Sequence, residues 1–360
     1  MLPRVKKYPL LLPLSFLYGL GVRLRNWLFD KGFLRSKSFP LPVIGIGNIT
    51  VGGTGKTPHT EYLVRLLSEH RKVAVLSRGY KRKSKGFLFY KEGIGAEEIG
   101  DEPCQMARKF PQIHIAVDAD RVHGVETLLQ NAVTHDTEVV LLDDAYQHRY
   151  IKPGLQILLI DHERPITNDW LLPAGRLREP VKGKERADII IVSKCPPDVN
   201  TLAWHKHLAP TARQQLFFTE LVYGDLYEPF TQTVQPMPDD QTHVLLLSGI
   251  ASPARMETYL RKHTSHIRTC TFADHHNFTE TELSDICAAF ERLPSPRMLI
   301  TTEKDAARLL THPHLPTCLR DNMKVLPITA GFMHDTENMF NKIITDYVTE
   351  NTRNCGVSAQ

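Results

Sequence analysis

Short apolar runs recur through the first half of the chain, and each ends in polar residues. Such runs are typical of strands in a parallel sheet, because these strands are buried on both faces. A segment with helical periodicity, residues 59–70, follows the first run. This alternation predicts βαβ units with right-handed crossovers, and therefore a mostly parallel sheet flanked by helices. The runs are 43–48, 73–78, 113–118, 139–144, 155–161 and 188–194.

The pattern changes after residue 195. Prolines and polar residues fill 196–215, and residues 217–230 read as two extended segments around Gly224 and Asp225. A second series of strand-like runs follows at 243–250, 266–272, 297–305 and 323–329, which predicts a second, smaller α/β domain. We therefore expect an N-terminal helical region (1–37), a core α/β domain (38–215), an extended hinge (216–241), a second α/β domain (242–350) and a polar tail (351–360).

The N-terminal run YPLLLPLSFLYGLGV, residues 8–22, is apolar and has basic residues on both sides. A membrane-spanning helix needs roughly 20 apolar residues, whereas this run is shorter and contains two prolines. Beyond the second proline, one helical face collects Leu17, Leu20, Leu24, Trp27 and Leu28. This pattern predicts an amphipathic helix in a membrane interface; the alternative is a helix packed on the protein's own core. A signal peptide is less favoured because no clear small-residue cleavage site follows.

Composition limits the class of partner. The chain has 360 residues, 42% of them hydrophobic, which suits two domains better than one. Its net charge of +4 is too small to indicate nucleic acid, and fits an anionic membrane surface or phosphorylated ligands equally well. Six scattered cysteines without a C-x-x-C pair are typical of free thiols in a reducing compartment. We expect no nucleic-acid partner, and no obligate protein partner is evident.

Residues 47–58, GNITVGGTGKTP, resemble a phosphate-binding loop without its first glycine. The usual pattern is G-x-x-x-x-G-K-[ST], and Thr50 stands where that glycine is expected. Three glycines give the backbone freedom to turn its N–H groups inward, Lys56 suits the β- and γ-phosphates, and Thr57 suits Mg²⁺. The loop also precedes a helix, whose N-terminus favours anions. We predict that nucleotide phosphates bind along Thr50, Val51, Gly52, Gly53, Thr54, Gly55, Lys56 and Thr57.

A second signal supports the loop. VVLLDDAYQHR, residues 139–149, is an apolar strand that ends in Asp143 and Asp144. This is the arrangement of a Walker B strand, in which one acid holds Mg²⁺ directly or through water. The sequence does not decide between the two acids, and a pair that caps the strand end is the alternative.

Three further stretches place ionisable groups beside proline or an aromatic residue: GDEP (100–103), LREP (177–180) and DHHNF (274–278). Each alone is a weak signal. Together with the loop, their order resembles the tetraacyldisaccharide 4′-kinase family, the lipid A 4′-kinases of Gram-negative bacteria. That family also lacks the first loop glycine. The resemblance also includes SRGY (77–80), VDADRVHG (117–124), LLDDAYQHR (141–149), LLPAGRLREP (171–180) and TTEKDA (301–306).

The resemblance implies transfer of the γ-phosphoryl group of ATP to the 4′-hydroxyl of tetraacyldisaccharide 1-phosphate, with ATP and Mg²⁺ as cofactors. Asp101 matches the family's catalytic acid, and His275 matches its partner in an acid/base dyad. Asp274 and His276 are adjacent alternatives. Because His275 falls in the second predicted domain, this dyad would assemble only when the domains close.

Weaker assignments follow from the same resemblance. Glu179 joins Thr57, Asp143 and Asp144 as a candidate metal ligand. Candidates for contacts with phosphate or substrate are Tyr80, Arg121, Gln147 and Arg178. For each of them a structural ion pair or a strand-end cap is the alternative.

The implied location is the cytoplasmic face of the bacterial inner membrane, with peripheral or monotopic attachment and an acylated disaccharide lipid as substrate. Two other functions stay open. A nucleotide-switch NTPase or metallochaperone is disfavoured because no [NT]-K-x-D motif occurs and the 17 histidines are dispersed. A soluble kinase for a small polar metabolite is disfavoured by the basic, leucine-rich N-terminus.

Overall fold

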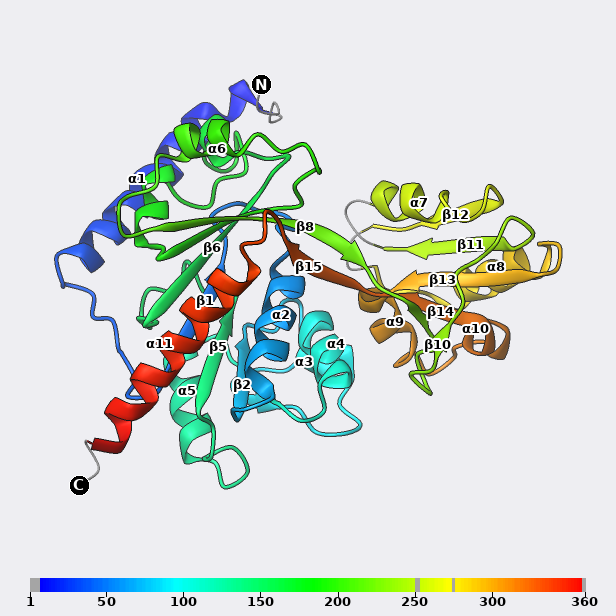
Figure 1. Ribbon diagram of the computed structural model, residues 1–360, viewed down its shortest axis with the longest axis horizontal. Helices are drawn as coiled ribbons and strands as arrows, with labels where there is room; N and C mark the ends of the chain where they lie inside the picture. Colours follow the sequence, from blue (N-terminus) through cyan, green and yellow to red (C-terminus); the bar gives the residue numbers. More distant parts are fainter. Residues whose placement is uncertain (1–6, 250–252, 274–275, 358–360) are drawn as a thin grey trace.

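The computed structural model describes residues 7–249, 253–273 and 276–357, and the chain forms two α/β domains that lie side by side (Figure 1). The first domain contains a nine-stranded sheet with the order β15-β8-β7-β6-β1-β5-β2-β4-β3. The second contains a six-stranded sheet with the order β10-β9-β14-β13-β11-β12. The predicted class, a mostly parallel sheet flanked by helices with a second smaller α/β domain, is confirmed.

The centre of the first sheet is parallel and fully covered. Strand β1 lies between β5 and β6 and pairs with both in parallel. Every residue of β1, β2, β5 and β7 is buried, as expected for apolar strands with helices on both faces. The strands of this sheet are β1 (Val43–Gly47), β2 (Val73–Ser77), β3 (Leu88–Phe89), β4 (His114–Val117), β5 (Val139–Asp143), β6 (Leu155–Asp161), β7 (Ile189–Ser193), β8 (Gln215–Tyr223) and β15 (Ile328–Phe332).

Helices cover this sheet on both faces. Helix α2 follows β1, and its residues Leu63 and Val64 join a core with Met106 of α4 and Phe340 of α11. Helix α5 packs against a separate cluster on the strands, through residues such as Leu128. The helices of this domain are α1 (Leu12–Asp30), α2 (Lys56–Ser68), α3 (Ala96–Ile99), α4 (Asp101–Lys109), α5 (Arg121–Gln130), α6 (Thr201–Leu208) and α11 (Glu337–Val357), with 3₁₀ turns η1 (Pro9–Leu11), η2 (Ile166–Asn168) and η3 (Val181–Arg186).

The second domain has its own core. Residues of β11, β13 and β14 pack against α8 and α10, with Phe290 and Leu319 among the fully buried side chains. Its strands are β9 (Leu226–Tyr227), β10 (Val234–Gln235), β11 (His243–Ser248), β12 (Ile267–Thr271), β13 (Arg297–Thr302) and β14 (Met323–Leu326). Its helices are α7 (Ala254–Leu260), α8 (Glu280–Glu291), α9 (Glu303–Leu309) and α10 (Thr317–Asn322).

The chain crosses between the domains twice, which corrects two predicted boundaries. The segment predicted as a hinge, 216–241, begins inside β8, which is a strand of the first sheet. The range 242–350 extends too far for the second domain, because β15 pairs antiparallel with β8 and α11 packs on the first core. Apolar residues of α11, such as Ile344, are buried there, so the last crossing returns the chain to the first domain (Figure 1).

Helix α1 packs on the first domain through its small residues. Ser15 is buried and donates a hydrogen bond from Oγ to the carbonyl of Leu171. Gly19 lies so close to Leu171 that an added Cβ would be 2.7 Å from its Cδ1. The predicted apolar face points elsewhere: the exposed side chains include Leu17, Leu20, Leu24 and Trp27.

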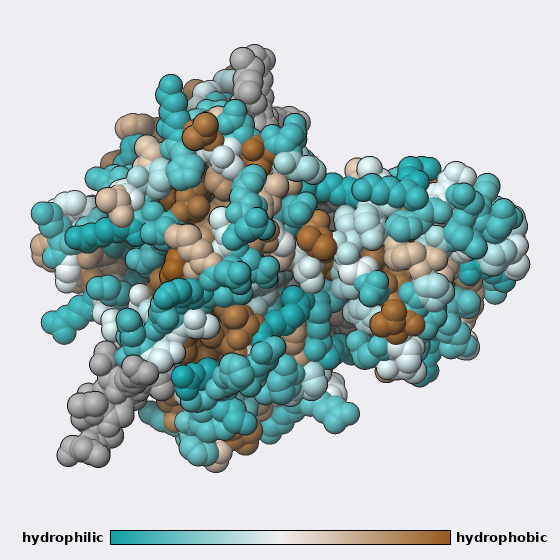
Figure 2. Space-filling model, in the orientation of Figure 1, coloured by the Kyte–Doolittle hydropathy of each residue, from teal (hydrophilic) through white to brown (hydrophobic). Residues whose placement is uncertain are grey.

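Within the described residues, no helix has both the length and the apolar character needed to cross a membrane. The hydropathy of the surface nevertheless differs between the two domains. In the face shown in Figure 2, the second domain is mostly hydrophilic, whereas apolar side chains are more frequent on the first domain.

Candidate active site

The loop between β1 and α2 is held from several sides. Asn48 donates from Nδ2 to Oγ1 of Thr54 at 2.8 Å, and Ser193 at the end of β7 donates from Oγ to the carbonyl of Thr54 at 2.8 Å. Lys194 donates to the carbonyl of Gly53. Gly55 has a φ of 80°, in the left-handed region that glycine tolerates. These contacts fix the loop's shape without using Lys56 or Thr57.

The structure explains why threonine stands at the first position of the loop. Thr50 forms an antiparallel bridge with Leu177, and Val51 N donates to the carbonyl of Arg176 at 2.9 Å. Thr50 is 4% exposed and does not adopt positive φ. Extended backbone suits a β-branched residue, so glycine is not needed there. The bridge also ties the loop to the segment that carries Arg178 and Glu179.

Two acids face the loop from the end of β5. Asp143 is paired in register with Ile46 of β1, is 1% exposed, and accepts hydrogen bonds from Thr60 and Ser77 at 3.3 Å each. Burial, together with the charge of Glu102, raises the pKa of Asp143 to about 7. A buried carboxyl with so high a pKa is typical of a functional site.

Asp144 has a different environment. Lys56 Nζ lies 3.6 Å from its Oδ1, and Arg178 Nη1 lies 3.2 Å from the same atom. Burial alone would raise the pKa of Asp144, but these two cations outweigh it and hold the pKa below its ordinary value. The residue also has a φ of 48°, which is uncommon outside glycine. Such backbone strain is frequent at functional sites.

The predicted residues Gln147, Arg178 and Glu179 come together in one hydrogen-bond network. Arg178 Nη1 lies 3.3 Å from Oε1 of Gln147, and Gln147 donates from Nε2 to Oε1 of Glu179 at 3.0 Å. Glu179 is 2% exposed and is paired with Arg186 at 2.8 Å. Asn26 of α1 also donates to it, at 3.4 Å. Protein groups thus already contact both oxygens of Glu179, which favours a role in orienting Gln147 over direct metal ligation.

Arg121, at the start of α5, is buried beside the same acids. It donates from Nη2 to the carbonyl of Asp144 at 3.3 Å and from Nη1 to that of Ala119 at 3.0 Å. Burial lowers its pKa to about 10, so the guanidinium stays charged at neutral pH. Its Nε is buried and has no hydrogen-bond partner among the described residues. A buried, unpaired donor in this position suits an incoming anion.

A short chain of contacts links the start of α4, where Asp101 lies, to these acids. Ser77 contacts Asp143, and two residues later Gly79 packs against Gly100, whose added Cβ would lie 3.3 Å from Gly79 Cα. Gly100 has a φ of 99° and precedes α4, so Asp101 is the first residue of that helix. The charge of Glu102 acts on Asp143. The start of α4 is therefore part of the same site.

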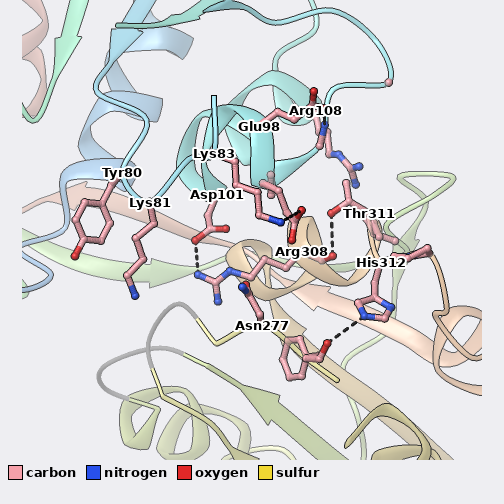
Figure 3. A pocket seen from close by; sticks show the side chains of 17 residues that line it. Tyr80, Lys81, Lys83, Glu98, Asp101, Arg108, Asn277, Arg308, Thr311 and His312 are labelled. Carbon is pink, nitrogen blue, oxygen red and sulfur yellow. Dashed lines mark hydrogen bonds and ion pairs between the residues drawn. The ribbon is translucent and has the colours of Figure 1, made fainter. Parts of the chain in front are cut away.

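A cavity of about 1070 Å³ lies between the two domains, with Asp101 in its wall. The first domain contributes Tyr80, Lys81 and Arg108, and the second contributes Asn277 and His312 (Figure 3). Tyr80, one of the candidate substrate residues, is 59% exposed on this side. The cavity is large enough for a small-molecule ligand, since such pockets measure roughly 300–1,000 Å³.

Arg308 of α9 also lines this cavity, and sequence reasoning gave it no role. Its Nη2 lies 2.5 Å from Oδ2 of Asp101, across the domain boundary (Figure 3). The motif TTEKDA, which ends two residues before Arg308, was the available signal, but a motif does not reveal a partner some 200 residues away in the chain.

The predicted dyad partner is not placed. His275 and its alternative Asp274 lie outside the described residues. His276 is described and has another partner: its Nε2 lies 3.0 Å from Oε2 of Glu282, and its ring stacks on Phe272 with centroids 4.8 Å apart. The described contacts of His276 thus lie within its own segment.

The oxygen donors near the loop suit Mg²⁺, a hard cation that prefers carboxylate, hydroxyl and phosphate oxygens. Asp143 and Asp144 bring two carboxyl groups to the mouth of the loop. The Thr57 hydroxyl has no hydrogen-bond partner among the described side chains. Glu179 fits this set less well because Arg186 and Gln147 already contact it.

A β1–loop–α2 unit with a lysine at the helix start and paired acids on the neighbouring strand defines a P-loop nucleotide-binding protein, and the cavity beside Asp101 adds room for an acceptor. Comparison with known proteins makes this specific. The family model described as tetraacyldisaccharide-1-P 4′-kinase matches residues 8–348. The chain belongs to this family.

Named relatives agree. The chain is 51% identical over 356 residues to a tetraacyldisaccharide 4′-kinase of Phocaeicola vulgatus, covering 97% of each chain. It is 42% identical over 345 residues to one of Flavobacterium johnsoniae, covering 95% of this chain and 97% of the relative. Among solved structures, it is similar to LpxK from Aquifex aeolicus in complex with ATP, with a TM-score of 0.74 and 30% identity over 94% of this chain and 98% of that one.

Proposed function

We propose that this protein transfers the γ-phosphoryl group of ATP to the 4′-hydroxyl of tetraacyldisaccharide 1-phosphate, a step of lipid A biosynthesis. The observation that carries the proposal is the placement of Asp101. This carboxyl lies in the wall of a cavity between the domains, and the next residue, Glu102, is near enough to Asp143 for its charge to act on that acid. Nucleotide and acceptor can therefore approach the same point from two sides. Family membership supplies the identity of the acceptor.

In the proposed reaction the 4′-oxygen attacks the γ-phosphorus, a new O–P bond forms, and the bond between the γ-phosphorus and the β–γ bridging oxygen breaks to release ADP. Asp101, with His275 as its proposed partner, accepts the hydroxyl proton. Because the transition state of phosphoryl transfer is loose, positioning and charge neutralisation contribute most of the rate. Lys56, Arg178 and Arg121 supply positive charge beside the loop.

Thr57 and one of the acids Asp143 and Asp144 would hold Mg²⁺. When bound, the ion neutralises charge on the nucleotide phosphates. Lys56 and Arg178 orient Asp144 on one side, while Thr60 and Ser77 orient Asp143 on the other. Glu179 positions Gln147 through the hydrogen bond described above.

We further propose that the protein works at the cytoplasmic face of the inner membrane. Helix α1 buries its small residues on the protein and leaves Leu17, Leu20, Leu24 and Trp27 exposed. An acceptor with four acyl chains is held in a membrane, so an apolar surface on the enzyme supports access to it. The net charge of +4 agrees with attraction to an anionic surface.

The test is a comparison of acceptors and nucleotides. We expect labelled γ-phosphate from Mg-ATP to appear on tetraacyldisaccharide 1-phosphate in mixed micelles, and not on water-soluble sugars. GTP should be a poor substitute. Labelling of a soluble sugar at an equal rate, or a preference for GTP, would favour one of the two other functions considered for this sequence.

A further inference from the structure

We propose that Arg308 is a positioning residue for Asp101, and that it makes the catalytic arrangement of the first domain depend on the second. This inference rests on the proposed function. It starts from the contact across the domain boundary in Figure 3, where the Arg308 guanidinium meets the Asp101 carboxylate. The two side chains are only 7% and 14% exposed.

Arg308 is anchored inside the second domain. Its Nη1 lies 3.3 Å from Oδ1 of Asp305, which is itself fully buried. Asp305 accepts hydrogen bonds on Oδ2 from Gly249 N at 2.9 Å and from Thr302 Oγ1 at 2.7 Å. Thr302 also caps the start of α9. The guanidinium therefore has one end fixed to the loop after β11 and to the helix that carries it.

The other end of the guanidinium reaches Asp101 at the N-terminus of α4. A cation of the second domain thus meets a carboxyl group at the start of a helix of the first domain. The geometry also restricts the carboxylate's rotation, because the pair is mostly buried and one Arg308 nitrogen is already engaged by Asp305. A proton acceptor held in one orientation contributes more to transfer than a freely rotating one.

A second ion pair fixes the relative position of the two helices. Lys109, at the end of α4, lies 2.5 Å from Glu303 at the start of α9, and 2.6 Å from Glu61 of α2. Asp101 and Arg308 lie at the opposite ends of the same helices. Helices α4 and α9 are thus antiparallel and joined at both ends. Because α4 belongs to the first domain and α9 to the second, separating the domains would break both contacts and release the Asp101 carboxylate.

The chain offers a matched control for Arg308. Arg255 of α7 also forms an ion pair between the domains, with its Nη2 2.6 Å from Oε1 of Glu163. The two side chains are 34% and 54% exposed and do not line the cavity; Arg255 also donates to the carbonyl of Lys194. Arg255→Gln removes an interdomain arginine of the same kind without touching Asp101, so it separates tethering of the domains from positioning of the carboxylate.

The experiment measures kcat and KM for lipid phosphorylation in the full-length wild type, Arg308→Gln, Arg308→Lys, Arg255→Gln, Asp101→Asn and the double variant Asp101→Asn/Arg308→Gln. We expect Arg308→Gln to lower kcat by about 100-fold with KM for ATP changed less than about 3-fold. Arg308→Lys should recover part of the loss, and Arg255→Gln should stay within about 3-fold of wild type. Thermal melting curves check folding; if Arg308→Gln does not fold, the Lys variant takes its place in the cycle.

The double variant decides the inference. If Arg308 acts through Asp101, adding Arg308→Gln to Asp101→Asn should cost less than about 3-fold more, because the two residues act as a unit. The inference would be overturned if Arg308→Gln lowered kcat as much in the Asp101→Asn background as in the wild-type background. It would also be overturned if Arg255→Gln lowered kcat as much as Arg308→Gln. In both cases the proposed function stands. No labelled lipid from the wild type would instead contradict the proposed function, and the inference with it.

Discussion

The ammonium group of Lys56 lies 3.6 Å from a carboxylate oxygen of Asp144. Lys56 begins α2 and Asp144 directly follows β5, so this pair spans the gap between the loop and the neighbouring strand end. Arg178 reaches the same carboxylate from a third segment. Asp144 therefore holds two cations in place before any phosphate arrives. A nucleotide entering the loop meets positive charge that is already oriented, which lowers the cost of reorganisation during transfer.

Removing that lysine should abolish most turnover. We expect Lys56→Met to lower kcat/KM for ATP by at least about 100-fold, because a preorganised cation near the transferred phosphoryl group is lost. The measurement is steady-state phosphorylation of the lipid. Lys182→Met, at an exposed position of η3, is the control and should behave as wild type. Similar losses in both variants would indicate a nonspecific effect of charge.

Asp143 predicts an unusual dependence of stability on pH. Its folded-state pKa is raised to about 7, above the unfolded value, so the folded carboxyl keeps a proton that the unfolded one releases. Its effect is therefore to reduce the free energy of unfolding as pH rises from about 4 to about 7. We expect Asp143→Asn to be inactive. Its free energy of unfolding relative to wild type should increase by roughly 1–3 kcal/mol as the pH rises from 4 to 8.

Urea denaturation at several pH values measures this gain. Glu61 also has a pKa raised to about 7 by burial and by the charge of Glu303. It therefore contributes to the pH dependence of the free energy of unfolding in both wild type and Asp143→Asn. The difference between wild type and Asp143→Asn isolates Asp143. A difference that does not change with pH would contradict the assignment of a protonated Asp143.

A variant of Glu179 tests whether this residue binds Mg²⁺ directly or positions Gln147. Glu179 is buried but its partner Arg186 is 26% exposed, so we expect Glu179→Gln to lose roughly 1–3 kcal/mol in the free energy of unfolding as the ion pair is broken. The Mg²⁺ concentration for half-maximal activity should shift less than in Asp144→Asn. Glu185→Gln, at an exposed position of the same segment, is the control. A larger Mg²⁺ shift in Glu179→Gln than in Asp144→Asn would favour direct ligation.

The exposed face of α1 predicts membrane association. We expect the double variant Leu17→Glu/Leu20→Glu to float with anionic vesicles at least about 10-fold less than wild type, because charge replaces apolar area in the interface. ATP binding should be unchanged. Val234→Glu on β10 is the control, since Val234 is 69% exposed and lies in the second domain, away from α1 (Figure 1). Equal flotation of all three proteins would contradict the role of α1.

The sequence was sufficient for those parts of the fold that depend on local pattern. The predicted run 139–144 became the buried parallel strand Val139–Asp143, and the loop at Lys56 lies between a strand and a helix as predicted. The pairing of strands that are distant in the sequence could not be predicted from local pattern. The run 323–329 was predicted as the last strand of the second series, but it divides into β14 and the start of β15, and β15 pairs with β8. An apolar strand does not reveal which sheet it joins.

The same limit applies to the site. The pattern identified Asp143 and Asp144, but the opposite shifts of their pKa values depend on burial and on Lys56 and Arg178, which meet only in three dimensions. The partners that occupy Glu179 and the contact of Arg308 with Asp101 also join distant segments. Neither relationship has a fixed spacing along the chain, so neither was predicted.

The most direct test of the account follows the γ-phosphate of ATP. Wild type and Asp101→Ala are each incubated with labelled Mg-ATP and tetraacyldisaccharide 1-phosphate, and the label is located on the product by mass spectrometry and NMR. We predict that wild type places the label on the 4′-oxygen and that Asp101→Ala gives at least about 100-fold less product. Label recovered only as inorganic phosphate, or on another hydroxyl, would contradict the account.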